Sequence, residues 1–146
     1  MSDEGVEFCD TNILVYAYDL SAGEKRSTAK RLVEGLWESG RGAVSLQVLQ
    51  EFFTTLTRKA SPPVSPPAAR HIVEDLATWR VYEPMRTDLF AAIDASMEWG
   101  ISFWDAMILV AARRSGARVL WSEDLNDGQE YGGVVVRNPF EHLQNS

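Results

Sequence analysis

Four carboxylates stand at positions where a folded chain could gather them around a reacting group. Asp10 directly follows a short apolar run, Val6 to Cys9, and Asp124 follows a later β-rich run. Glu51 and Asp105 lie in stretches with helical periodicity. Carboxylates supply oxygen ligands, which select hard cations such as Mg²⁺ or Mn²⁺. Such a cation can activate water and clamp a phosphate group, so these residues favour phosphodiester hydrolysis.

Asp10 and Glu51 each have an ordinary structural explanation as well. Asp10 suits a turn or the N-cap of a helix, where aspartate is common. Glu51 falls roughly 60° from Val48 around its helix, at the border of the apolar stripe. A glutamate at that border can keep its carboxylate in water. Neither residue alone distinguishes a metal ligand from a structural role.

Asp105 is the most informative of the four carboxylates. Ile108, Leu109 and Ala112 follow it at helical spacing, which places the carboxylate on the inward face of the helix. A buried, unpaired carboxylate is costly, so one explanation is a bound cation. The other is a capping box with Ser102, in which the Asp105 side chain bonds back to the helix start. One residue can serve both roles in part.

Convergence is the argument that joins the four residues. In open α/β sheets, ligands bind beyond the carboxyl ends of the strands. Asp10 and Asp124 each follow a strand, whereas Glu51 and Asp105 lie near helix starts, so one sheet edge can hold all four. We therefore predict a single acidic pocket. The remaining acidic residues considered are interpreted as turn or surface charges: Asp19, Asp94, Glu98, Glu123 and Asp127.

The elements that position these residues alternate along the chain. Apolar, β-rich runs predict strands near residues 6–9, 43–44, 81–82, 119–121 and 134–136. A turn with a short helix is expected after Asp10, and longer helices over about 21–40, 45–60, 66–76, 87–100 and 102–115. This alternation is typical of a parallel sheet covered by helices on both faces. We expect a three-layer α/β/α sandwich.

Side-chain spacing predicts details of three helices. Ser21 and Glu24 have the spacing of a capping box for the helix that ends at Gly40. The inward stripe of that helix is expected to contain Ala29, Leu32, Val33, Leu36 and Trp37. The stripe of the following helix is Val48, Leu49, Phe52, Phe53 and Leu56. The helix that starts near Thr87 carries Leu89, Phe90, Ile93 and Met97.

Length and composition indicate one domain over residues 1–146. Hydrophobic residues make up 45% and charged residues 24% of the chain, as in ordinary globular proteins, so one core suffices. The segment SPPVSPP at 61–67 is too short to separate domains. The longest apolar run, Ala106 to Ala112, is far shorter than a membrane span, and the chain begins with acidic residues, so we expect a cytoplasmic location. Cys9 is expected in the core.

Several other chemistries have little support. The net charge of −7 has the wrong sign for a protein that coats nucleic acid non-specifically, although carboxylates gathered around metal would account for part of it. His71 and His142 lack a Cys or His partner at zinc spacing, and no Ser-His-Asp constellation is visible. Trp37 and Trp121 are interpreted as core residues rather than base-stacking platforms, whereas the role of Trp104 is left open.

Four segments around the acidic residues have the order and spacing of a known set of motifs. They are DTNILVYAYD around Asp10, QEFF around Glu51, FWDAMILVAA around Asp105 and LWSEDLNDG around Asp124. Together they resemble the PIN-domain ribonucleases and, within them, the VapC-type toxins of bacterial toxin-antitoxin pairs. The resemblance covers nearly the whole chain. The first and third segments are the most specific.

The resemblance implies a PIN-like fold, with a mainly parallel, about five-stranded sheet between helices. It implies an endoribonuclease that uses Mg²⁺ or Mn²⁺ to cut structured RNA, commonly tRNA or rRNA. The catalytic and metal-binding residues would be Asp10, Glu51, Asp105 and Asp124, with Glu51 as a ligand or as the base that accepts a proton from water. The implied partners are a VapB-like antitoxin and a second copy of the chain.

Two further groups of residues are candidates for supporting roles. Asn12 and Ser122 match positions that commonly support the metal shell, although both also suit local turns and caps. Basic residues near the ends of two helices are candidate RNA phosphate contacts, although a solvated helix face or charges that suit the helix dipole are the more common explanation. These candidates are Arg58, Lys59, Arg113 and Arg114, with Arg118 beside them.

Two rival functions belong to other classes. An acidic-pocket phosphoryl-transfer domain, such as a receiver or a phosphatase, also places Asp after an early strand. The phosphatase motif has a second Asp two residues later, where this chain has Asn12, and no characteristic lysine follows a late strand. The second rival is a non-catalytic binding module with the PIN fold. The presence of all four acidic residues argues against it.

Overall fold

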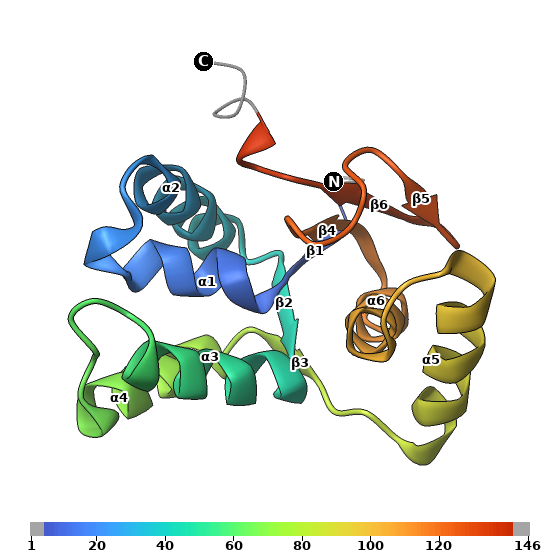
Figure 1. Ribbon diagram of the computed structural model, residues 1–146, viewed down its shortest axis with the longest axis horizontal. Helices are drawn as coiled ribbons and strands as arrows, with labels where there is room; N and C mark the ends of the chain where they lie inside the picture. Colours follow the sequence, from blue (N-terminus) through green and yellow to red (C-terminus); the bar gives the residue numbers. More distant parts are fainter. Residues whose placement is uncertain (1–4, 142–146) are drawn as a thin grey trace.

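One six-stranded sheet lies at the centre of the computed structural model, which describes residues 5–141 (Figure 1). The strands are β1 (Val6–Cys9), β2 (Gly42–Ser45), β3 (Arg80–Tyr82), β4 (Ala117–Trp121), β5 (Glu130–Tyr131) and β6 (Val134–Arg137). Their order is β3-β2-β1-β4-β6-β5, and every neighbouring pair is parallel except β5 with β6. The predicted, mainly parallel sheet is confirmed.

The sheet has one strand more than the sequence pattern predicts. The additional strand is β5, which has two residues and pairs antiparallel with β6. Gly132 and Gly133 join the two strands, both with positive φ, 58° and 96°. Positive φ at both positions is what a two-residue type I′ hairpin turn requires, and glycine adopts it without strain. A strand this short leaves no alternation of apolar and polar residues for a pattern to detect.

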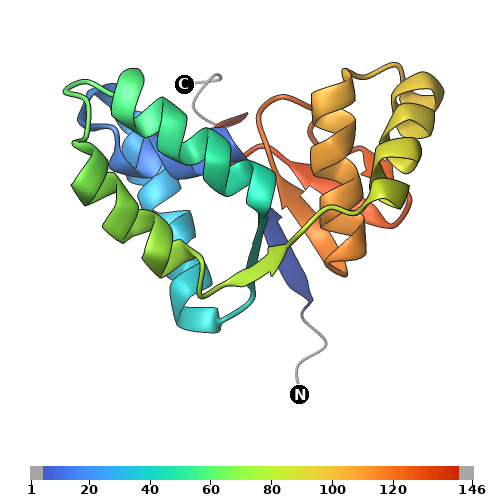
Figure 2. The same ribbon diagram turned by 90° about the horizontal axis from the view of Figure 1, so that it is seen from below.

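Helices flank the sheet, as expected for an α/β fold. They are α1 (Thr11–Tyr18), α2 (Glu24–Ser39), α3 (Leu46–Arg58), α4 (Pro66–Leu76), α5 (Arg86–Trp99) and α6 (Phe103–Arg114), with a 3₁₀ turn η1 (Leu20–Ala22). Figure 2 shows α1 to α4 grouped on one side of the molecule and α5 beside α6 on the other. Within residues 5–141, none of the helices has the length and apolar character needed to span a bilayer.

Serine caps determine where the two later site-bearing helices begin. Ser45 Oγ accepts a hydrogen bond from the backbone N of Val48 (3.2 Å) at the start of α3. Ser102 Oγ accepts one from the backbone N of Asp105 (3.0 Å) at the start of α6. Each such cap stabilises a helix by about 1 kcal/mol. The first turns of α3 and α6 are therefore fixed against the sheet edge.

The capping box predicted from Ser21 and Glu24 is wrong. α2 begins at Glu24 and is preceded by Gly23, whose φ of 64° suits glycine. Ser21 lies in η1 instead, where Asp19 Oδ1 accepts hydrogen bonds from its backbone N (2.9 Å) and its hydroxyl (2.7 Å). Asp19, only two residues away, thus engages the Ser21 groups that a capping box would use.

Burial agrees with the predicted inward stripes of α2 and α3 except at two positions. Cys9 is fully buried, so its predicted place in the core is confirmed. Phe53 is 37% exposed and Trp37 is 40% exposed, unlike the other members of their stripes. Trp37 packs edge-on against Trp79, with ring centroids 5.3 Å apart, at the rim of the core. Its predicted place in the core is therefore wrong.

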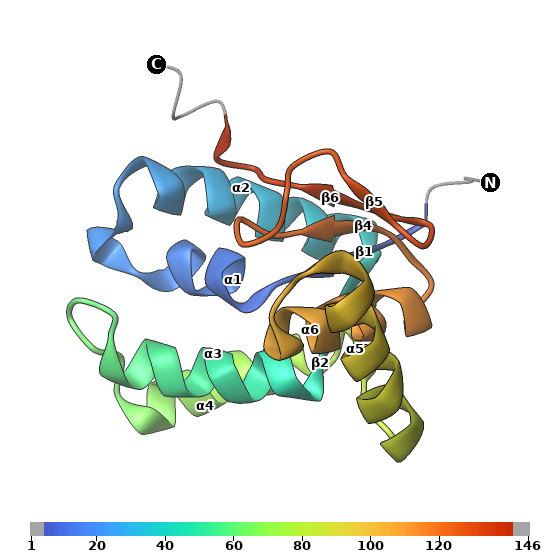
Figure 3. The same cartoon turned by 45° about the vertical axis from the view of Figure 1, so that its right-hand side comes forward.

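α5 leaves its large apolar residues exposed. α5 lies beside α6 (Figure 3), and its inward face consists of small residues. Ala92 and Ala95 pack against Ala106 and Val110 of α6. Small side chains on both helices allow the two backbones to approach closely, but they cover little apolar surface. The exposed face of α5 contains Met85, at its N-cap, and then Leu89, Phe90, Ile93 and Met97.

The register of β1 and β4 brings distant parts of the chain together. Cys9 stands opposite Trp121 across this parallel pair, and the backbone N of Asp10 donates to the carbonyl of Trp121 (3.0 Å). The backbone N of Ser122 donates to the carbonyl of Arg137 on β6 (3.0 Å). The segments that follow β1 and β4 therefore leave the sheet side by side at its carboxyl edge.

Candidate active site

A cavity of about 320 Å³ opens beyond the carboxyl ends of β1 and β4. The four predicted carboxylates all line it, and each comes from a different segment: the end of β1, α3, the first turn of α6 and the loop after β4. The structure thus brings together residues far apart in the sequence. The complete lining is Asp10, Thr11, Asn12, Gln47, Glu51, Thr55, Trp104, Asp105, Ile108 and Asp124. We call this space the acid cavity.

Asp10 is the most buried of the four, with 6% of its surface exposed. Its Oδ1 accepts a hydrogen bond from the backbone N of Thr11 (2.7 Å), and its Oδ2 accepts one from the Ser122 hydroxyl (2.9 Å). Burial, followed by the negative charges of Asp124 and Asp105, raises the pKa of Asp10 to about 7 despite these bonds. A cation that binds in the cavity near neutral pH would therefore displace a proton from Asp10.

Glu51 is held on the cavity wall by both of its oxygens. The Thr11 hydroxyl donates to Oε1 (2.7 Å) and the Gln47 side-chain amide donates to Oε2 (3.1 Å). The Glu51 side chain is therefore half-buried and fixed, unlike a boundary glutamate whose carboxylate moves freely in water. Neither donor is predicted from the sequence. The available signals were the four-residue spacing of Gln47 and Glu51 along α3 and the position of Thr11 beside Asp10.

Asp124 stands exposed at the rim of the acid cavity. Asn12 Nδ2 donates to Asp124 Oδ2 (3.4 Å), and the backbone N of Asp124 donates to the Ser122 hydroxyl (3.1 Å). Partial burial raises the pKa of the Asp124 carboxyl, followed by the charges of Asp105, Glu123 and Glu51. Ser122 thus contacts two of the four carboxylate residues, and its own side chain is fully buried.

Asp105 belongs to the capped first turn of α6, and its carboxylate faces the cavity. Ser102 caps its backbone N, which is one half of the predicted capping box. Among the hydrogen bonds of residues 5–141, the return bond from the Ser102 backbone to the Asp105 carboxylate is not found. The Asp105 charge instead raises the pKa of both Asp10 and Asp124, as expected for like charges near one another.

Comparison with known proteins identifies the family. The family model of the PIN domain matches residues 8–126, a range that runs from β1 through the loop after β4 and contains all four carboxylates. The chain belongs to the PIN-domain family. A search of curated proteins finds no match.

Solved structures similar to this PIN domain include a toxin-antitoxin complex and a toxin. A toxin-antitoxin complex from Klebsiella pneumoniae has 22% identity and a TM-score of 0.68, over 92% of this chain and 98% of that one. VapC20 of Mycobacterium tuberculosis, a sarcin-ricin loop cleaving toxin, has 23% identity and a TM-score of 0.59 over 81% and 89%. VapBC2 of Rickettsia felis, bound to promoter DNA, has 16% identity and a TM-score of 0.63 over 91% and 98%. At these identities the similarity concerns the fold.

The acid cavity of the PIN domain fits a divalent cation by donor type and charge. Its potential metal ligands are carboxylate, hydroxyl and amide oxygens. No Lys or Arg of residues 5–141 forms a salt bridge with any of the four carboxylates. In the same part of the chain, no three Asp, Glu, His or Cys side chains lie close enough to enclose one ion. Mg²⁺ needs no such enclosure, because it keeps several waters and takes one or two carboxylates directly.

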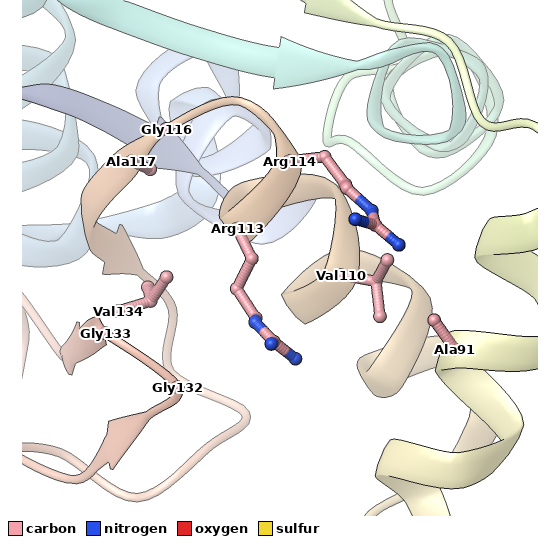
Figure 4. A pocket seen from close by; sticks show the side chains of 9 residues that line it. All are labelled: Ala91, Val110, Arg113, Arg114, Gly116, Ala117, Gly132, Gly133 and Val134. Atoms are coloured by element: carbon pink, nitrogen blue, oxygen red, sulfur yellow. The ribbon is translucent and has the colours of Figure 1, made fainter.

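The predicted RNA contacts lie away from the acid cavity. Arg113 and Arg114 occupy the last turn of α6, about 12 Å along the helix from Asp105. They line a separate cavity of about 380 Å³, where Arg113 extends toward Gly132 and Arg114 toward α5 (Figure 4). Arg114 Nε is 3.1 Å from a carboxylate oxygen of Asp88. Arg58 and Lys59 end α3, beyond Glu51. A role in RNA binding stays a prediction for all of them.

Glu123 is not a surface charge, contrary to the sequence interpretation. Its carboxylate accepts hydrogen bonds from the Tyr16 hydroxyl (2.6 Å) and from Lys25 Nζ (2.9 Å). Its side chain is mostly buried, and these two partners belong to α1 and α2. Glu123 therefore anchors the loop that carries Asp124 to the helices beside β1.

Proposed function

We propose that this PIN-domain protein is a metal-dependent endoribonuclease and the toxin of a VapBC-type toxin-antitoxin pair. One observation carries the proposal: carboxylates from four separate segments line one cavity and have no basic partner among residues 5–141. A fold that needed these groups only for stability would pair or neutralise them. Uncompensated like charges in a cavity are instead suited to bind a cation.

The similar structures support the reaction and the partner. VapC20 is described as a toxin that cleaves the sarcin-ricin loop, and the Klebsiella pneumoniae structure is a toxin-antitoxin complex. We carry these properties to this chain as part of the proposal. The substrate would be a structured RNA, tRNA or rRNA, in the cytoplasm. A VapB-like antitoxin would be the inhibitory partner, and two copies of the chain would form a homodimer.

The four carboxylates of the acid cavity would have two tasks in this reaction. Mg²⁺ or Mn²⁺ bound here would offset the charge of the phosphodiester and lower the pKa of a water molecule. Asp10, Asp105 and Asp124 would hold the cation, one or two of them directly and the rest through its water ligands. Glu51 would either ligate it or accept a proton at Oε2. Thr11 and Gln47 fix the Glu51 carboxylate in place for either role.

Ser122 and Asn12 would act through the carboxylates. The Ser122 hydroxyl donates to Asp10 and accepts from the Asp124 backbone, so it sets the spacing of these two residues. Asn12 orients the Asp124 carboxylate at the cavity rim. Groups of this kind, which orient metal ligands without binding metal themselves, commonly change metal affinity by 10- to 100-fold.

Cleavage of RNA by purified protein tests the proposal. We expect the wild type to cleave a mixture of tRNA and rRNA at defined sites with Mg²⁺ or Mn²⁺, and EDTA to abolish cleavage. Asp105→Asn should slow cleavage by about 100-fold or more, whereas Asp94→Asn, an exposed acid on the neighbouring helix, should not change it. A wild type that cleaves neither RNA, or an Asp105→Asn variant as fast as the wild type, would refute the proposal and favour a non-catalytic module.

A further inference from the structure

Trp104 is exposed although it is the largest kind of apolar side chain. It lies in the first turn of α6, directly before Asp105, and 62% of its surface is in contact with solvent. Tryptophan is usually well buried or covered by a partner, because its large apolar surface is costly to hydrate. Trp104 also lines the acid cavity, together with the four carboxylates.

The position of the Trp104 ring is fixed on one side only. It packs edge-on against the Phe103 ring, with centroids 4.9 Å apart and an interplanar angle of 74°. The Ser102 cap holds the backbone of this helical turn. A rigid aromatic ring that is open to solvent at the mouth of a polar cavity is the arrangement used to stack a planar ligand.

The other four tryptophans have different surroundings. Trp37 and Trp79 pack against each other, and Trp99 packs against Tyr131. The Trp121 indole N–H donates to Glu7 (2.8 Å). None of them lines the acid cavity. The combination of an exposed ring and a place in the cavity wall is therefore specific to Trp104 among the tryptophans of this chain, all of which lie within residues 5–141.

Charge also favours an aromatic contact for RNA at this site. The chain carries a net charge of −7. The candidate arginines of α6, Arg113 and Arg114, lie at the opposite end of this helix from Trp104. Phosphate contacts can therefore contribute little affinity next to the acid cavity until a cation is bound. Stacking depends on the face of a nucleobase rather than on phosphate charge, so it can hold RNA beside carboxylates.

We propose that Trp104 forms a base-binding subsite, in which its indole ring stacks on an unpaired nucleobase adjacent to the phosphate in the acid cavity. This inference rests on the proposed ribonuclease function and adds a substrate requirement to it. A base within a duplex is already stacked on both faces, so the subsite selects a loop, a bulge or a strand end. It tolerates any base, because each has a stacking face.

Single-turnover cleavage of tRNA and rRNA, and then of a short hairpin RNA that contains the mapped site, tests the proposal. Trp104→Leu should raise the half-saturating protein concentration by about 5- to 150-fold and leave the maximal rate within a few-fold. Trp104→Phe should lie between Trp104→Leu and the wild type. The matched control is Trp37→Leu, which removes a half-exposed tryptophan outside the acid cavity and should leave both parameters unchanged.

Replacement of a loop nucleotide by an abasic ribose locates the stacked base. At the correct position the abasic RNA should weaken binding to wild type as much as Trp104→Leu does, and the two changes combined should cost no more than either alone. The salt dependence should be the same for wild type and Trp104→Leu, because stacking releases no counterions. Circular dichroism melting checks that each variant is folded.

The outcomes separate this inference from the proposed function. If wild type cleaves no RNA, the function itself fails. If wild type cleaves RNA but the half-saturating protein concentration of Trp104→Leu equals that of wild type, the base subsite is refuted. If Trp104→Leu changes only the oligomeric state in gel filtration, Trp104 is a protein contact and the subsite is likewise refuted.

Discussion

Two buried aspartates, Asp10 and Asp88, show opposite solutions to the same problem. Both are nearly inaccessible to solvent, at 6% and 1% exposed, and both lie next to the start of a helix. Burial by itself raises the pKa of either carboxyl. The rest of their surroundings differ, and that difference separates a structural carboxylate from a candidate catalytic one.

Asp88 has a complete set of donors. It accepts hydrogen bonds from the backbone N of Met85 (2.8 Å), from the Tyr82 hydroxyl and from Arg114 Nε (3.1 Å). Burial raises its pKa, but these donors and the Arg114 charge outweigh burial, so the pKa of Asp88 ends below its usual value. The cluster joins β3, α5 and α6, and its charge is balanced within the protein.

Asp10 has two neutral donors and two negative neighbours. The Thr11 amide and the Ser122 hydroxyl do not outweigh burial and the charges of Asp124 and Asp105. The pKa therefore rises to about 7. Burial of a carboxylate therefore does not by itself mark a functional site, whereas burial without a balancing positive charge favours one.

The largest expected effect distinguishes the two aspartates by activity. Asp10→Asn should reduce RNA cleavage by on the order of 10²- to 10³-fold, because it removes a charge from the acid cavity. Asp88→Asn, which removes an equally buried charge elsewhere, should retain cleavage within a few-fold. Initial rates on the same RNA under saturating Mn²⁺ measure both. Equal losses of cleavage in the two variants would contradict a specific role for Asp10 in catalysis.

Loss of Asp88 should reduce the stability of the fold more than loss of Asp10 does. Asp88→Ala leaves the Tyr82 hydroxyl and the Met85 amide without an acceptor and should cost about 2–3 kcal/mol. The half-exposed Arg114 can turn to water, which limits the loss. Urea denaturation with Asp94→Ala, an exposed acid on the same helix, as the control measures the difference. A loss no larger than that of the control would show that the Asp88 cluster does not stabilise the fold.

The pH dependence of stability should differ in sign for the two groups. In metal-free protein, folded Asp10 keeps its proton up to about pH 7, whereas in the unfolded chain it loses it near 4. The free energy of unfolding should therefore fall as pH rises between these values, by on the order of 2 kcal/mol. This is about half of the change that the pKa difference gives for a rigid protein, because the folded protein can relax around the charged carboxylate. Asp10→Asn should remove this fall.

Asp88 contributes in the opposite direction. Because its folded pKa lies below the usual value, its stabilisation is present above about pH 4 and is lost as pH falls further. Urea denaturation of wild type, Asp10→Asn and Asp88→Asn from pH 3 to 8, with EDTA present, separates the two windows. A wild type that follows the same profile as Asp10→Asn between pH 4 and 7 would contradict the assignment to Asp10.

A smaller effect tests the link between Asp10 and Asp124. Ser122→Ala removes the hydroxyl that donates to Asp10 and accepts from the Asp124 backbone. It should weaken Mn²⁺ binding by about tenfold. Ser115→Ala is the matched control, because among residues 5–141 the buried hydroxyl of this C-cap residue bonds only to the Ala111 carbonyl of α6. Calorimetry on both variants measures the effect, and equal affinities would exclude Ser122 from the ion site.

The sequence predicts the acid cavity well because local patterns and topology both point to it. Asp10 and Asp124 follow runs that are recognisable as strands, and parallel strands place such residues at one edge. Asp105 lies on an apolar face, where a carboxylate is out of place. Each signal depends on short-range spacing and on one general property of parallel sheets, so the four positions can be recognised before any contact is known.

The features that the sequence does not predict depend on contacts between distant residues. Glu123 has an ordinary loop setting until Tyr16 and Lys25 are seen to bind it. Asp88 has the spacing of a helix-start residue, and its partners Tyr82 and Arg114 are not related to it by any periodic pattern. A pairing between particular side chains leaves no periodic trace in the chain, so it has to be observed.

The exposed face of α5 illustrates a second limit of sequence patterns. Periodicity identifies apolar residues on a helix, but it does not reveal whether a neighbouring element covers them. α5 packs on α6 through Ala92 and Ala95, and the larger Phe90 and Met97 remain in solvent. Most of the apolar residues at the same spacing on α3 are covered by α1 and α4. Burial therefore depends on tertiary neighbours, which the pattern does not contain.

Calorimetric titration of the protein with Mn²⁺ tests the central claim most directly. We predict that wild type binds Mn²⁺ below millimolar concentration, with a heat that depends on the ionisation enthalpy of the buffer because Asp10 releases a proton. Asp10→Asn should bind far more weakly, and Asp88→Asn should bind like wild type. No binding by wild type, or equal binding by Asp10→Asn, would contradict the claim that the acid cavity holds the cation.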